Sequence, residues 1–174
     1  REAVKGAGEA MKGMEERIVG KEKAIEEGRR KIEEEGEILA KMKEESDLLD
    51  AQVAEQTVLI ESEQKRQKEV QRDHEEKNAP EVYEAMSDEE RKLLNDDIEK
   101  LKIDTEVFTA DMEKWMELSE EAGKKMDAVK EFGNGLEELG KDCDNWEKEL
   151  EGMRVELEGM RVELEGMRVA VDDS

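Results

Sequence analysis

Residues 78–90 read Asn-Ala-Pro-Glu-Val-Tyr-Glu-Ala-Met-Ser-Asp-Glu-Glu and contain the single proline of the 174-residue chain. Pro80 lacks the backbone N–H that a helix interior needs, and its ring biases Ala79 away from helical angles. Ser87 and Glu90 have the spacing of a capping box, in which a serine oxygen and a glutamate side chain satisfy free N–H groups at a helix start. This stretch therefore predicts the end of one helix and the beginning of another.

The composition indicates an all-α protein. Charged residues make up 47% of the chain and aromatic residues 3%, which is typical of long helices and coiled coils. A compact globular domain of this length would carry more aromatic and β-branched residues to fill its core. The hydrophobic fraction of 35% suits a narrow apolar seam between two helices.

Heptad spacing covers the chain on both sides of the turn. Before it, one register holds from Met11 to His74, with seam positions that alternate at spacings of three and four. Polar residues interrupt this seam, so the first arm would form only a weak dimer by itself. After the turn, a second register begins at Ile98. We predict a first long coiled-coil helix at 1–77, a tip or turn at 78–87, and the proximal half of a second helix at 88–132.

The second arm carries an interruption followed by a repeat. Its seam changes phase at Gly133, Asn134 and Gly135, which predicts a hinge at 133–135, either a kink or a full break of the helix near residues 132–136. The distal half is predicted at 136–174. It contains Glu-Leu-Glu-Gly-Met-Arg-Val three times without change, at 149–155, 156–162 and 163–169. Such a uniform repeat specifies register poorly, because a slip of seven residues changes little.

The two arms have similar lengths, which favours a long antiparallel helical hairpin. A turn centred near residue 82 would place Ile18 opposite Trp146 and Lys21 nearly opposite Cys143. The alternative topology is a straight parallel dimer, in which the turn is only an interruption.

The middle of the hairpin is more apolar than a two-helix seam requires. Helices that are apolar on more than one face are covered by something further. We therefore expect a four-helix node here, formed with a second copy or with helices of a partner, and the alternative is a wider stretch of ordinary seam. The predicted partner-binding residues are Leu48, Ala51, Val58, Leu59, Val107, Phe108, Trp115 and Met116.

The sequence offers little for catalysis. His74 is the single histidine, so the chain cannot build a histidine-paired metal site or a triad. Cys143 and the two tryptophans fall on the seam, where they are interpreted as packing residues. No phosphate-binding glycine motif is present. We predict no catalytic residue, no metal, no cofactor and no enzymatic activity.

The formal net charge of −23 makes nucleic acid and anionic membranes poor partners. No run of eighteen apolar residues is present, so no membrane insertion is expected. One cysteine fits an intracellular location, in the cytoplasm or nucleus. Because the sequence starts at Arg1 without a methionine, we expect a piece of a longer protein.

These observations favour a structural or scaffolding coiled-coil protein that mediates protein–protein assembly by helix packing. It would act as a subunit of a larger complex and form a homo-oligomer or a hetero-oligomer. The alternative is a chaperone-like or adaptor module that binds client helices through its methionine-rich apolar middle. A third class is an acidic decoy that mimics nucleic acid.

Overall fold

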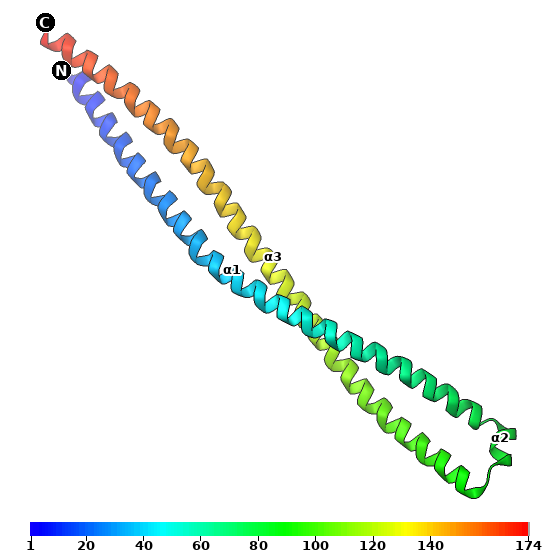
Figure 1. Ribbon diagram of the computed structural model, residues 1–174. Coiled ribbons are helices and arrows are strands. Elements are labelled where there is room, and N and C mark those ends of the chain that lie inside the picture. Colours follow the sequence, from blue (N-terminus) through cyan, green and yellow to red (C-terminus); the bar gives the residue numbers. More distant parts are fainter. Residues whose placement is uncertain (174) are drawn as a thin grey trace. The chain divides into compact units, whose positions relative to one another are not determined.

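The computed structural model describes residues 1–173 and contains three helices, α1 (Glu2–Lys77), α2 (Pro80–Ala85) and α3 (Asp88–Asp172). No strand occurs within these residues. The long helices α1 and α3 run antiparallel and pack against each other, as the ribbon diagram shows (Figure 1). The prediction of an all-α helical hairpin is confirmed.

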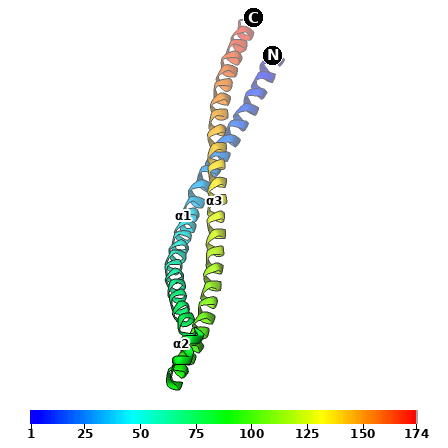
Figure 2. The same ribbon diagram turned by 90° about the vertical axis from the view of Figure 1, so that its right-hand side faces the viewer.

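The turn is explained by the side chains and backbone of residues 78–90. Ala79 adopts an extended conformation (φ −55°, ψ 134°) before Pro80, which occupies the first position of α2, where a missing N–H is harmless. Ser87 then caps α3, because its Oγ accepts a hydrogen bond from the backbone N–H of Glu90 at 3.2 Å. Figure 2 shows α2 as a short helix between the end of α1 and the start of α3.

Arg91 ties α2 to the first turn of α3. Its Nε donates to the carbonyl oxygen of Tyr83 at 3.1 Å, and its Nη2 donates to that of Glu84 at 3.1 Å. The guanidinium also lies 5.1 Å from the centroid of the Tyr83 ring, within the range of a cation–π contact. One side chain thus satisfies carbonyl groups at the end of α2.

Contacts divide the chain into two units, each an antiparallel pair of helical segments. The tip unit is Met42–Val129, and the terminal unit combines residues 1–41 with residues 130–173. The core of the terminal unit is built from seam positions of both helices, and cross-helix ion pairs lie beside it. Its central cluster consists of Met14, Ile18, Leu150 and Leu157, packed against Met11, Ile25, Met153 and Met160.

The pairing in the terminal unit corrects the predicted register. Lys21 does not face Cys143; its Nζ lies 2.7 Å from the Glu149 carboxylate. Gly28 faces Cys143 instead, since a Cβ placed on Gly28 would lie 2.6 Å from the Cys143 Sγ. Ile18 likewise packs with Leu150 rather than lying opposite Trp146.

The shift of about one heptad has a simple cause. The turn contains α2 and ends at the Ser87 cap, so its centre lies beyond residue 82. Moving one helix by seven residues along the other returns apolar positions to the same face. The heptad pattern is therefore satisfied equally well by both registers.

The second arm is one helix. α3 continues through Gly133, Asn134 and Gly135, and no residue from 1 to 173 has a positive φ. Of the two forms left open for the hinge at 133–135, a kink or a full break, the full break is not found, and the predicted halves at 88–132 and 136–174 belong to one helix. Each helical glycine costs about 1 kcal/mol relative to alanine, and this cost does not interrupt α3. A Cβ on Gly133 would lie 3.7 Å from Leu39, an ordinary contact distance, so this part of α3 runs close beside α1. Bending about these residues stays a prediction.

Within residues 1–173, no helix combines the length and apolarity that crossing a membrane requires.

Candidate interaction surface

The tip unit contains a polar link across its seam. The indole N–H of Trp115 donates to Thr57 Oγ1 at 2.9 Å, and the Thr57 hydroxyl donates to the Val53 carbonyl oxygen at 2.7 Å. Both bonds are partly buried. Trp115 therefore packs within the hairpin, as its seam position predicts, and its role in binding a partner stays a prediction.

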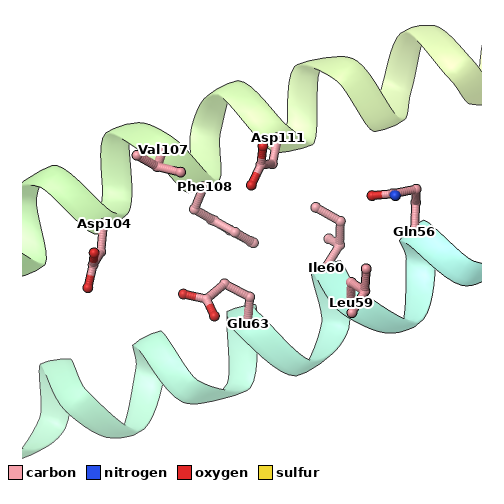
Figure 3. A pocket seen from close by; sticks show the side chains of 8 residues that line it. All are labelled: Gln56, Leu59, Ile60, Glu63, Asp104, Val107, Phe108 and Asp111. Carbon is pink, nitrogen blue, oxygen red and sulfur yellow. The ribbon is translucent and has the colours of Figure 1, made fainter.

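A groove lies beside this seam, and its lining begins at Asp111, four residues before Trp115 on α3. Its volume is about 420 Å³, which falls within the usual range for ligand pockets. Side chains of both helices point into it (Figure 3), and its lining comprises Gln56, Leu59, Ile60 and Glu63 from α1 with Asp104, Val107, Phe108 and Asp111 from α3.

Apolar side chains form much of this groove. Ile60 is 7% exposed and Phe108 is half-buried, so these two belong to the seam. Leu59 and Val107 remain 57% and 55% exposed. The hairpin therefore leaves these two aliphatic side chains largely uncovered beside an apolar seam.

Carboxylates surround the apolar part. Glu63 accepts hydrogen bonds from Arg66 Nη2 at 2.6 Å and from Arg66 Nε at 3.1 Å, and these bonds lower the pKa of Glu63 below its ordinary value of 4.5. Arg66 also reaches Asp104 Oδ2 at 3.4 Å. Asp111 has no ion pair with any residue from 1 to 173. The carboxylate of Glu63 is thus paired with Arg66, whereas Asp111 has no ion-pair partner among the described residues.

The same α1 segment lacks positive charge. Residues 44–64 contain neither lysine nor arginine. Their acidic residues are Glu44, Glu45, Asp47, Asp50, Glu55, Glu61 and Glu63. On α3, residues 103–113 also contain no basic residue. The apolar groove therefore lies in a region of strongly negative charge.

The structure brings together three of the eight predicted partner-binding residues. Leu59, Val107 and Phe108 line the groove. The others lie outside this lining, and apart from Trp115 they are exposed: Leu48 (67%), Val58 (62%) and Met116 (59%), together with Ala51.

Sequence reasoning missed the acidic residues of the groove, because it selected side chains by apolarity alone. Their heptad positions held the relevant signal, since Asp104 and Asp111 are seven residues apart and each directly precedes a seam position. The predicted hinge residues take no part in this groove.

The reactive residue types lie elsewhere. Cys143 is completely buried, and a Cβ on Gly28 would lie 3.4 Å from the ring of Trp146 as well as close to the Cys143 Sγ. His74 Nδ1 is buried and makes no hydrogen bond with the described residues. Across residues 1–173, no group of three or more His, Cys, Asp or Glu side chains is arranged to hold a metal ion.

Comparisons with protein-family models, with curated proteins and with solved structures found no match.

Proposed function

We propose that this chain is a non-enzymatic structural coiled-coil protein that mediates protein–protein assembly as a subunit of a larger complex. One observation carries the proposal. Large aliphatic side chains of the tip unit remain exposed beyond the seam, and contiguous apolar surface on a soluble protein commonly marks an interaction site. The most exposed of them are Leu48, Leu93, Val58, Ile103, Met116, Leu59 and Val107.

Helix packing is the proposed mode of recruitment. A two-helix surface offers apolar grooves that match the apolar face of another helix. The partner copies or chains would complete a four-helix arrangement around the tip unit, as a homo-oligomer or a hetero-oligomer. The single buried thiol of Cys143 favours an intracellular setting, in the cytoplasm or nucleus, where thiols stay reduced.

A chaperone-like or adaptor role would use flexible methionine side chains as an adaptable surface. In the tip unit, Met116 and Met126 are 59% and 41% exposed, and these two side chains favour that second candidate. Met42 and Met112 are half-buried, so the methionine surface is small. Assembly through fixed helix packing has the broader support.

A double variant tests the assembly role. Leu48→Glu with Val58→Glu places two charges on exposed positions, so the fold should survive while helix docking is weakened. We expect light scattering to report a lower oligomer mass, or a tagged full chain to lose specific protein partners identified by mass spectrometry. Val155→Glu with Val162→Glu is the matched control, because these valines are 70% and 66% exposed in the terminal unit. Equal behaviour of the two double variants would contradict the proposed function.

A further inference from the structure

We propose that the groove between α1 and α3 in the tip unit binds an amphipathic helix of a partner protein, whose apolar face is flanked by lysine or arginine. This inference rests on the proposed assembly function and specifies the chemistry of the partner. Three properties of the groove lead to it, namely its dimensions, its exposed aliphatic side chains and its charge.

The dimensions fit a helix. The groove follows α1 from Gln56 to Glu63, about two turns or roughly 11 Å at 1.5 Å per residue. A docked helix would present apolar side chains at spacings of three, four and seven along such a distance. Leu59 and Val107, which come from opposite helices, would contact these anchors from both sides. Phe108 and Ile60 would form the surface beneath them.

The charge selects the partner. Residues 44–64 contain no lysine or arginine. Lys125 pairs with Glu45 and Arg66 pairs with Glu63 near the two ends of this segment, and the charge that a partner helix meets between them is negative. Asp111 projects toward the groove (Figure 3) and has no ion pair within residues 1–173. A lysine or arginine beside the apolar face of the partner would supply the missing counter-charge. Such charge complementarity increases the association rate and discriminates against wrong partners.

A second copy of the chain fits this groove less well. A two-fold contact brings the same surface of both copies together, so Asp104 and Asp111 of one copy would approach those of the other. The net charge of −23 adds repulsion between copies. The geometry therefore favours a basic partner over self-association at this groove.

Synthetic helices provide the test. The first probe is a fluorescent peptide of about 16 residues, or roughly four turns, with leucines along one face and lysines on both flanks. A second peptide replaces every lysine with glutamate, and a third keeps the lysines but replaces every leucine with serine. Fluorescence anisotropy with the full chain should show that the lysine–leucine peptide binds at least about tenfold more tightly than either control. Its affinity should fall as salt is added.

Substitutions locate the binding site. Leu59→Gln with Val107→Gln should weaken binding of the lysine–leucine peptide by about tenfold, and Asp111→Asn should reduce its salt dependence. Both aliphatic positions are more than half exposed, so circular dichroism should remain that of the native protein. Val155→Gln with Val162→Gln is the matched control and should leave the affinity unchanged.

Several results would overturn the inference. They are equal binding of the lysine–leucine and lysine–serine peptides, equal binding to the native chain and the groove variant, and tight binding of the glutamate peptide. A dimer that Leu59→Gln with Val107→Gln converts to a monomer would assign the groove to a second copy. That outcome rejects the basic partner while leaving the assembly role in place. Failure of the assembly role itself is seen separately, in the comparison of Leu48→Glu/Val58→Glu with its control.

Discussion

The substitution Gly28→Ala tests the register of the hairpin, because Gly28 lies opposite Cys143 in the seam. A Cβ on Gly28 would lie 2.6 Å from the Cys143 Sγ and 3.4 Å from Trp146 Cζ3. Cys143 is fully buried, so its sulfur has little space to move. Gly28→Ala must therefore displace the packed side chains of α3.

Two opposing contributions determine the effect of Gly28→Ala on stability. Replacing a helical glycine with alanine stabilises a helix by about 1 kcal/mol, whereas overpacking a filled core typically costs about 1–3 kcal/mol. At Gly20 only the first contribution applies, because a Cβ there would have no neighbour within 4 Å. We expect Gly28→Ala to be less stable than Gly20→Ala by about 1–3 kcal/mol.

Urea unfolding followed by circular dichroism measures this difference. A double-mutant cycle then assigns it to the sulfur, because Cys143→Ala removes the atom that the new methyl group would meet. The loss caused by Gly28→Ala should largely disappear in the Cys143→Ala background, which corresponds to a coupling energy of about 1–3 kcal/mol. If Gly28→Ala stabilises the protein as much as Gly20→Ala and shows no coupling to Cys143, the observed pairing of α1 with α3 is wrong.

Three further predictions follow from individual contacts. Gly28→Cys should form an intramolecular disulfide with Cys143 under mild oxidation, because the two positions are adjacent across the seam; mass spectrometry of the oxidised monomer measures it. Ser87→Ala removes the N-terminal cap of α3 and should cost about 1 kcal/mol, which hydrogen exchange in the first turn of α3 would detect. The pKa of Glu45 is lowered, chiefly by its hydrogen bond from Lys125, so Glu45→Gln should lower stability at neutral pH and make no difference in acid, as measured by urea unfolding at several pH values.

The sign of the Glu45 effect follows from linkage. A carboxylate whose pKa is lowered by folding contributes stability above its ordinary value of 4.5 and loses that contribution as the pH falls through the lowered pKa. The difference in free energy of unfolding between the native and Glu45→Gln proteins should therefore vanish on acidification. A difference that stays constant with pH would contradict the ion pair of Glu45 with Lys125.

For the disulfide, Lys21→Cys is the control, since Lys21 pairs with Glu149 and should not crosslink efficiently to Cys143. If hydrogen exchange in the first turn of α3 is unchanged after Ser87→Ala, the Ser87 cap does not stabilise that turn.

Heptad spacing and the turn residues were sufficient to predict the hairpin. Pro80 and Ser87 mark the turn because their chemistry is local, and local rules can be read from sequence. The seam is similarly predictable, since its period identifies which side chains become buried. Leu150 and Leu157 are seven residues apart, as heptad seam positions are, and both are buried in the structure together with Ile18 of the first register.

Register and the groove needed three-dimensional information. A shift of one heptad leaves the apolar pattern unchanged, so no periodicity argument could pair Gly28 with Cys143. That choice depends on a steric match between one missing side chain and one buried sulfur. The groove depends on which flank of the seam brings Leu59 and Val107 together with Asp111. Apolarity alone had grouped Leu59, Val107 and Phe108 with residues that lie outside the lining of the groove.

The three identical heptads near the C-terminal end of α3 pack against α1, in which glutamates also recur at a spacing of seven residues. Arg154 pairs with Glu22 at 3.1 Å, and Arg161 approaches Glu15 at 4.0 Å, so two successive units make equivalent ion pairs. Insertion or deletion of one unit would change the length of α3 by about 10 Å and would substitute one equivalent set of contacts for another. Genetic expansion or contraction of this repeat could thus adjust the reach of the protein while the packing around Gly28 and Cys143 stays intact.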